Sequence, residues 1–297
     1  MIIGRQQDVT VAATSVMERT SDPRLREIMV SLVKHLHGFV RDVRLTEAEF
    51  REAAAILVEI GQRSTDTHNE AILMAGSLGV SSLVCLLNNG DQGNTETAQS
   101  LLGPFWRMHS PRIANGGSIV RSETPGAPLF VTARVVDASG NPIAGAEVDV
   151  WHASPVGLYE NQDPGQADMN LRGKLTTDAE GRFWFRSVMM VGYPIPTDGM
   201  VGRLLKSQSR HPYRPAHLHA LIFKPGFKVL ISQVYDPADP HIDSDAQFGV
   251  TRALIGDFLR HDESHPTEPG IGTPWYSLDH VYRMEAGEAV LPRPPIK

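Results

Sequence analysis

The apolar residues of this chain change their spacing near residue 100, and the change divides the sequence into two parts. Over the first hundred residues they recur at intervals of three and four, as on one face of an amphipathic helix. From about residue 127 they fall into short β-rich runs separated by turn residues, which is typical of strands. We therefore expect a mainly β protein, with an N-terminal α-helical domain over residues 1–100 and an antiparallel β-sandwich catalytic domain over residues 101–297.

Local signals predict the helices of the N-terminal part. Residues 22–23 are an Asp N-cap and a Pro at the first helical position, and they open a helix with an apolar stripe over residues 25–40. Residues 46–49 have the capping-box form and open a second helix. A third helix is expected over residues 66–87, and a short further one over residues 8–20. The buried face of the second helix is expected to continue through Phe50, Ala54, Leu57 and Ile60. So thin a helical core needs support from the rest of the chain, a second subunit, or both.

Short strands with turn signals between them predict the sandwich. The expected strands cover residues 129–136, 147–152, 216–223 and 228–235, and residues 177–186 indicate a tight hairpin. The connections over residues 153–173 and 187–215 are longer than ordinary loops. Because binding and catalytic residues concentrate on such loops, both are candidates for function.

The charge and cysteine content exclude some classes of function. With 28 basic and 34 acidic residues the net charge is −6, so no broad positive field is available for a nucleic acid. The single cysteine, Cys85, allows no intrachain disulfide, which suits a reducing cytoplasm. The sequence shows neither the apolar core of a signal peptide nor an apolar run long enough to span a membrane. We therefore expect a cytoplasmic protein.

A His-x-His pair is the sharpest local signal for a metal site. His217 and His219 lie two residues apart in a predicted strand, so their imidazoles point to the same face. Imidazole binds zinc, copper, iron and nickel, so the pair does not identify a metal. Two histidines on a polar sheet face would have the same pattern.

Two of the six tyrosines occur in unusual loop contexts. Tyr159 and Tyr193 are flanked by glycine or proline, which restrict the direction of the backbone. A phenolate becomes a good ligand when a strongly acidic ion such as Fe(III) lowers the phenol pKa from about 10. Two phenolates with two imidazoles would favour ferric over ferrous iron. The alternative is two rings packed over one end of the sandwich.

Several separated motifs, in order along nearly the whole chain, resemble one known family. These motifs are residues 101–106, 145–151, 157–162, 193–199 and 214–219. Together they resemble the intradiol ring-cleavage dioxygenases, in the branch of the catechol and hydroxyquinol 1,2-dioxygenases. The resemblance implies a β-sandwich catalytic domain, and a helical domain that forms a homodimer interface and often holds phospholipid.

The resemblance also implies a metal site and roles for individual residues. One Fe(III) per subunit would be held by Tyr159, Tyr193, His217 and His219. Tyr193 matches the ligand that leaves the metal and accepts a substrate proton, whereas Tyr159 matches the one that stays bound. Arg214 would stabilise charge that develops during oxygen attack, although a surface salt bridge is its alternative role. Gln233 would orient the bound substrate.

The implied reaction inserts both atoms of O₂ between the two hydroxyl-bearing carbons of an aromatic diol. Residues 102–105 and 193–202 resemble the hydroxyquinol branch, which predicts maleylacetate as the product; catechol or chlorocatechol, giving muconates, is the alternative. The residues expected to line the substrate pocket are Leu73, Gly76, Gly103, Pro104, Phe105, Ile195, Pro196 and Gln247. Gly76 stands where hydroxyquinol members tend to have Asp, and Gln247 where a small apolar residue is usual. A buried amide needs a partner, so Gln247 is expected to bind a polar ring substituent.

Two interpretations from other classes remain open on the residues alone. One is a non-catalytic β-sandwich module with a structural metal, because a fold does not determine chemistry. The other is a zinc or copper enzyme that uses only the histidine pair, which leaves the two tyrosines without a role.

Overall fold

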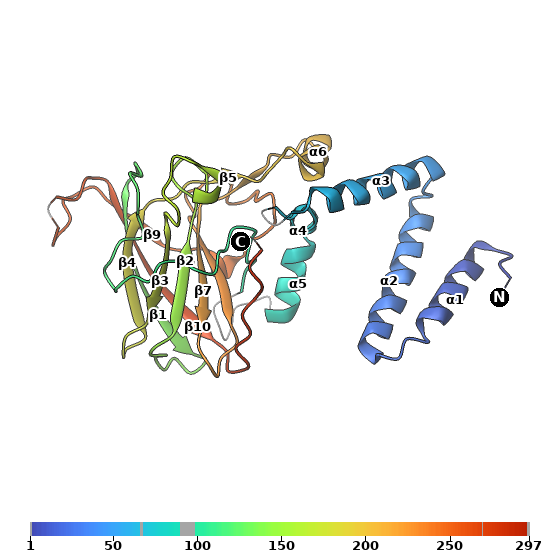
Figure 1. The fold of residues 1–297 in the computed structure, drawn as a ribbon, viewed down its shortest axis with the longest axis horizontal. Coiled ribbons are helices and arrows are strands. Elements are labelled where there is room, and N and C mark those ends of the chain that lie inside the picture. Colours follow the sequence, from blue (N-terminus) through green and yellow to red (C-terminus); the bar gives the residue numbers. More distant parts are fainter. Residues whose placement is uncertain (1, 66–67, 90–98, 269, 296–297) are drawn as a thin grey trace. The chain divides into compact units, whose positions relative to one another are not determined.

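The computed structural model describes residues 2–65, 68–89, 99–268 and 270–295. The chain forms two compact units, Met1–Glu59 and Ile60–Lys297. The first holds α1 (Gln6–Met17), α2 (Pro23–Asp42) and most of α3 (Glu47–Arg63), and the second holds all later elements, shown in Figure 1. Helices α4 (Glu70–Ser77) and α5 (Val80–Asn89) therefore share a compact unit with the sheets.

The two helix starts expected from capping residues are confirmed. The Asp22 carboxylate accepts a hydrogen bond from Leu25 N at 2.8 Å, with Pro23 in the first turn of α2. At the start of α3, Thr46 N donates to Glu49 Oε2 at 2.8 Å and Glu49 N donates to Thr46 Oγ1 at 3.3 Å. These reciprocal bonds satisfy backbone donors that the helix itself leaves free.

The apolar faces of α2 and α3 are mostly not buried in this chain. None of the residues of α2 is buried, and Leu36 and Phe39 are 51% and 53% exposed. The expected buried face of α3 is wrong for the single chain, because Phe50 and Leu57 are 62% and 70% exposed and only Ile60 is buried. The spacing of apolar residues identifies the face of a helix but not the surface that covers it.

The single helix expected over residues 66–87 is two helices in the described part of that range, which leaves out residues 66–67. Gly79, between α4 and α5, has a φ of +73°, a conformation that glycine adopts without a Cβ clash. No single helix among the described residues is long and apolar enough to cross a membrane. The pair α4 and α5 meets the length and composition test together, but is bent by 78°.

The β-sandwich is confirmed, with one pair of strands differing from expectation. One sheet has the order β4 (Arg182–Val188), β1 (Pro128–Asp137), β10 (Trp275–Met284), β9 (Phe258–His261). The other has the order β3 (Arg172–Thr176), β2 (Glu147–Trp151), β7 (His217–Phe223), β8 (Leu230–Tyr235). Side chains from both sheets form one hydrophobic core. The sandwich is not wholly antiparallel, because the last strand, β10, returns parallel to β1.

The hairpin expected over residues 177–186 is wrong. Strands β3 and β4 belong to different sheets, so the turn between them carries the chain across the sandwich. The smaller elements are β5 (Tyr193–Pro194), β6 (Tyr213–Arg214), α6 (Met200–Ser207) and the short 3₁₀ helices Glu160–Gln162 and Arg252–Leu254. Most of them belong to the long connections singled out in the sequence.

Strand β7 determines where the site lies. Leu218, Ala220 and Ile222 point into the main core, so His217 and His219 point to the opposite face of the same sheet. A second hydrophobic cluster covers that face, formed by Phe105, Trp106, Trp151, Ala153, Tyr159, Tyr193 and Leu221. The histidines are therefore buried between a sheet and the loops that cross it.

Candidate active site

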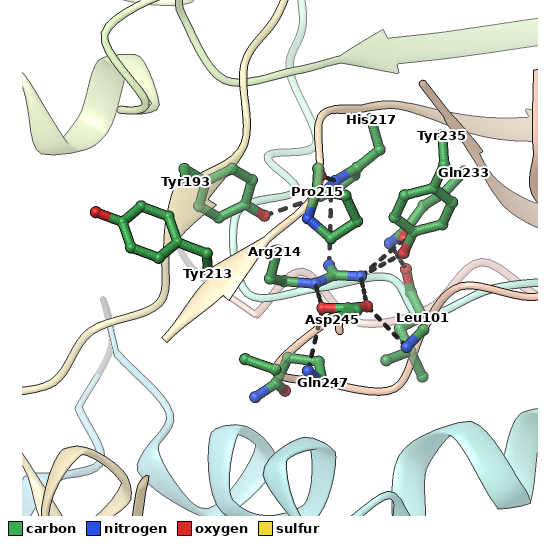
Figure 2. Close-up of polar contacts among 12 residues, drawn as sticks. Leu101, Tyr193, Tyr213, Arg214, Pro215, His217, Gln233, Tyr235, Asp245 and Gln247 are labelled. Atoms are coloured by element: carbon green, nitrogen blue, oxygen red, sulfur yellow. Dashed lines mark hydrogen bonds and ion pairs between the residues drawn. The ribbon is translucent and has the colours of Figure 1, made fainter. Parts of the chain in front are cut away.

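Four side chains from three separate segments converge on one point. Around the ring that they form, Tyr159 Oη lies 3.2 Å from Tyr193 Oη, and Tyr193 Oη lies 3.4 Å from His217 Nε2. His217 Nε2 lies 3.1 Å from His219 Nε2, which lies 3.2 Å from Tyr159 Oη and closes the ring. Figure 2 shows the Tyr193 hydroxyl directed at His217.

This geometry fits a single metal ion. A tetrahedral ion with bonds of about 2.0 Å has ligand-to-ligand edges of about 3.3 Å, close to the four distances observed. The described residues contain no group of three or more His, Cys, Asp or Glu that could hold a metal. A metal at this point would therefore need the tyrosine oxygens as well as the histidine nitrogens.

Neighbouring groups orient the donors. The Nδ1 of His217 lies 2.6 Å from the Pro215 carbonyl oxygen, an acceptor that holds the proton on Nδ1 and leaves Nε2 free to bind a metal. Trp151 stacks on His219 with ring centroids 4.6 Å apart, and Phe105 stacks on Tyr159 at 4.4 Å.

Burial determines the protonation states of the four donor side chains. It lowers the pKa of His217 to about 3, with the positive charge of Arg214 acting in the same direction, and lowers the pKa of His219 well below its usual value. Both imidazoles are therefore neutral at pH 7. Burial also raises the pKa of Tyr159 well above 10 and raises that of Tyr193. The phenols would ionise only next to a strongly acidic cation, which agrees with the donor set of a ferric site.

Arg214 forms a buried ion pair rather than a surface salt bridge. Its Nε lies 3.1 Å from Asp245 Oδ1 and its Nη2 lies 3.2 Å from Asp245 Oδ2 (Figure 2). Nη2 also donates to Gln233 Oε1 at 3.2 Å and to the Tyr235 hydroxyl, and Nη1 lies 3.4 Å from His217 Nε2. The guanidinium thus has a fixed place beside the four-donor ring.

Gln233 lies behind the ring rather than in the cavity lining. Its Nε2 donates to the Leu101 carbonyl at 2.7 Å and lies 3.3 Å from His219 Nδ1, while its Oε1 accepts from Arg214. It connects the residue before the 102–105 motif with two of the site groups.

A cavity of about 450 Å³ opens beside this cluster. Its lining includes Tyr193 and Arg214 and seven of the eight expected pocket residues, namely Leu73, Gly103, Pro104, Phe105, Ile195, Pro196 and Gln247. The eighth, Gly76, lies directly behind Gln247, and a Cβ at position 76 would overlap Gln247 Oε1. The Gln247 amide donates to Ser77 Oγ at 2.7 Å and to the Leu73 carbonyl at 3.4 Å.

A second buried charge network supports Tyr159 from behind. Arg172 is 1% exposed, and its Nε donates to Glu160 Oε1 at 2.7 Å. Its Nη1 donates to the Phe105 carbonyl at 2.6 Å, and its Cζ lies 5.9 Å from the centre of the Tyr159 ring. Arg107 donates to the same Glu160 oxygen at 2.9 Å. One guanidinium therefore joins a cavity wall to the segment that carries Tyr159.

Sequence reasoning missed several residues of the site. Asp245, Tyr235 and Arg172 carry no motif of their own, because each acts on a residue distant in sequence. The C-terminal residues Arg293, Pro294 and Pro295 also line the cavity, and nothing in their sequence indicates a pocket.

Two family models match this chain. The one described as Dioxygenase covers residues 102–276, and the one described as Catechol dioxygenase N terminus covers residues 22–95. Hydroxyquinol 1,2-dioxygenase of Rhizobium sp. (strain MTP-10005) is 42% identical over 90% of this chain and 90% of its own length. The 6-chlorohydroxyquinol 1,2-dioxygenase of Cupriavidus pinatubonensis is 40% identical over 87% of this chain and 93% of its own.

A solved structure also matches this chain over most of its length. The crystal structure of hydroxyquinol 1,2-dioxygenase from Pseudomonas putida DLL-E4 matches with a TM-score of 0.86 and 37% identity. The match covers 95% of this chain and 99% of the other.

Proposed function

Because the chain belongs to the intradiol ring-cleavage dioxygenase family, we propose that it uses O₂ to open hydroxyquinol between two adjacent hydroxyl-bearing carbons, forming maleylacetate. Catechol or a chlorocatechol, giving cis,cis-muconates, is the alternative substrate. The observation that carries the proposal is the closed ring of two phenol oxygens and two imidazole nitrogens beside a cavity of about 450 Å³. The cavity and the family membership favour this enzyme over a non-catalytic module.

We assign one Fe(III) per subunit to Tyr159, Tyr193, His217 and His219. Neutral imidazoles and ionisable phenols are donors that suit ferric iron, and the four edges of 3.1–3.4 Å fit bonds of ordinary length. When bound, Fe(III) would supply Lewis acidity, which would lower the pKa of the phenols and of a bound diol and make the diol ring reactive toward O₂.

The two tyrosines have different surroundings, which supports different roles. Tyr193 lines the cavity, so its oxygen is within reach of an entering diol and can accept a proton from it. Tyr159 is 1% exposed and held between Phe105 and the Arg172 network, so it stays in place.

Gln233 acts on the substrate through Arg214. Arg214 lines the cavity and can stabilise negative charge that develops on the substrate, since Asp245 and Gln233 hold its guanidinium in one orientation. Gln233 contacts Arg214 and the Leu101 carbonyl but does not line the cavity. We therefore assign it a positioning role, in place of the direct substrate contact expected from the sequence.

The residues that line the cavity favour a hydroxylated catechol as the substrate. Leu73, Phe105, Ile195 and Pro196 supply apolar surface for the ring. Gln247 is the polar group on the α4 side, and its amide nitrogen is already bonded to Ser77. Its Oε1 accepts no hydrogen bond from the described residues, so it is available to a further ring hydroxyl. Gly76 makes room for this side chain.

We assign homodimer formation to the helical domain over residues 1–100 and catalysis to residues 101–297. The exposed apolar stripe of α2 supports this assignment, because a second copy of the chain would cover it. We assign phospholipid binding to the same apolar surface. The single cysteine, Cys85, is compatible with a cytoplasmic location.

Steady-state kinetics on four diols test the substrate. We expect a higher kcat/KM with hydroxyquinol than with catechol or 4-chlorocatechol, with maleylacetate identified as the hydroxyquinol product. Protocatechuate tests whether a ring carboxylate is accepted. Fastest turnover of plain catechol would remove the role given to Gln247. Absence of ring opening with all four diols in iron-loaded protein would overturn the proposed reaction.

A further inference from the structure

The C-terminal segment returns to the active-site cavity. After β10 ends at Met284 the chain runs back toward α4 (Figure 1). Arg293, Pro294 and Pro295 line the cavity together with Leu73 of α4. The proposed reaction gives this segment no role.

The cavity lining is positively charged, although the chain has a net charge of −6. Among the described residues, the lining contains two arginines and no aspartate, glutamate, lysine or histidine. Arg214 is buried and its charge is balanced by Asp245. Arg293 is exposed and forms no hydrogen bond or ion pair with the described part of the chain. The unbalanced charge of the cavity is therefore that of Arg293.

Prolines restrict the backbone that carries this charge. Pro292 precedes Arg293, and Pro294 and Pro295 follow it. A proline fixes its own φ, and the residue before a proline is held in an extended conformation. Arg293 therefore belongs to a stiff segment of backbone. Ligand binding would restrict little more than its side chain, so the loss of conformational entropy would be small.

We propose that Arg293 is a specificity-determining residue that binds a carboxylate carried on the ring of the diol substrate. The proposal rests on the proposed function and deepens it, because it adds a charged ring substituent to the substrate class. In this proposal the diol end would bind beside Tyr193 and Arg214, which are buried, and the ring carboxylate would bind Arg293, the exposed charged residue of the same lining.

The chemistry of the two arginines separates their roles. A guanidinium can bind a carboxylate through two parallel hydrogen bonds. Asp245 already occupies the Nε and Nη2 groups of Arg214, so a second carboxylate cannot bind there in this way. None of the guanidinium donors of Arg293 bonds to a described residue, so they are open to a ligand. The hydroxyl-binding role given to Gln247 is independent of this contact.

Anaerobic titration calorimetry on the iron-loaded full chain tests the proposal. Two ligands are compared, protocatechuate and its amide 3,4-dihydroxybenzamide, which has nearly the same shape but no carboxylate charge. Without O₂ no turnover interferes with the measurement. We expect wild-type protein to bind protocatechuate more tightly than the amide. We expect Arg293→Gln to weaken protocatechuate binding about five- to tenfold and to leave amide binding unchanged.

Two further variants complete the design. Arg293→Lys keeps the charge without the planar fork and should restore part of the affinity for protocatechuate. Arg121→Gln removes an exposed arginine that does not line the cavity, so it should leave both affinities unchanged. Equal loss of affinity for both ligands in Arg293→Gln, no loss for either, or wild-type protein that prefers the amide or binds neither ligand would overturn the proposal.

The proposed function is judged separately, by ring opening of hydroxyquinol and catechol by wild-type protein. If that turnover is present while Arg293→Gln binds both ligands like wild type, only the inference about Arg293 fails. If iron-loaded wild-type protein opens neither diol, the proposed function itself fails.

Discussion

Gln247 occupies the space that a side chain at position 76 would need. A Cβ added to Gly76 would overlap Gln247 Oε1 and would lie 2.7 Å from Cδ of the same amide. The two residues come from α4 and from the loop after β8, so only the fold brings them together. A substitution at one position therefore acts on the cavity through the other.

Gln247→Leu tests this pair through substrate choice. Leucine keeps much of the bulk of glutamine but removes the acceptor oxygen. A third ring hydroxyl then has no hydrogen-bond acceptor there, which weakens its binding by about 1–2 kcal/mol. We expect kcat/KM for hydroxyquinol to fall about tenfold and that for catechol to change little. Gly76→Ala should shift the same ratio, because it must displace the amide. An equal change with both substrates in both variants would contradict the assignment.

Arg172→Met tests whether the buried network positions Tyr159. The change leaves the Phe105 carbonyl and Glu160 without their buried partner. We expect a loss of about 3–5 kcal/mol in the free energy of unfolding, and a shift in the visible band of the iron-loaded protein because Tyr159 moves. Arg107→Met is the matched control, since Arg107 bonds the same Glu160 oxygen, whereas the hydrogen bond to the Phe105 carbonyl comes from Arg172. A band that shifts in neither variant, or equally in both, would remove the positioning role.

His152 makes stability depend on pH. Burial lowers its pKa to about 4, and its ring nitrogens lie 2.8 Å from the Ala153 carbonyl oxygen and 2.6 Å from Ser187 Oγ. Between about pH 6.5 and pH 4 the unfolded chain binds a proton here that the folded chain does not. Lowering the pH through this window should therefore cost up to about 3 kcal/mol of folding free energy.

His152→Gln isolates this contribution in chemical denaturation from pH 7 to pH 4. Burial raises the pKa of Asp149 to about 6, so that group binds its proton more readily in the folded chain and has the opposite effect in the same window. Because Asp149 is unchanged in the variant, the difference between the two proteins reports His152. We expect the variant to lose less stability on acidification, and parallel curves would contradict the prediction.

The exposed stripe of α2 predicts a dimer that depends on it. Replacing Leu32 and Leu36 with glutamate places charges on a surface where each leucine is about half exposed, at 46% and 51%. Burying a leucine contributes about 1.5–3 kcal/mol, so we expect the dimer to dissociate at micromolar concentration. Light scattering should then give about half the wild-type mass. Lys34→Glu, at an exposed polar position between them, should leave the mass unchanged. A dimer that persists in the double variant would place the interface elsewhere.

Local rules predicted much of the fold. Caps and spacing located α2 and α3, and the short apolar runs located most strands, because these signals depend on neighbouring residues. The errors have a common cause. The hairpin at residues 177–186, the buried face of α3 and the single helix over residues 66–87 all depended on which surface each segment packs against, which spacing does not encode.

The site residues also divide into those with a local sequence signal and those that depend on the fold. The pair His217 and His219 is visible in a strand pattern, whereas placing Tyr159 and Tyr193 beside it required the resemblance to a family. Asp245 and Arg293 had no sequence signal, because only the path of a loop brings Asp245 to Arg214 and only the path of the tail brings Arg293 to the cavity lining.

The visible spectrum of the purified protein, with iron quantified in the same sample, tests the central claim most directly. The account predicts about one iron per chain and a broad red-brown band from tyrosinate-to-iron charge transfer, which shifts when hydroxyquinol is added without O₂. Replacing Tyr159 with phenylalanine should change that band, since one of the two phenolates is lost. A protein that stays colourless after reconstitution with iron would contradict the four-residue site.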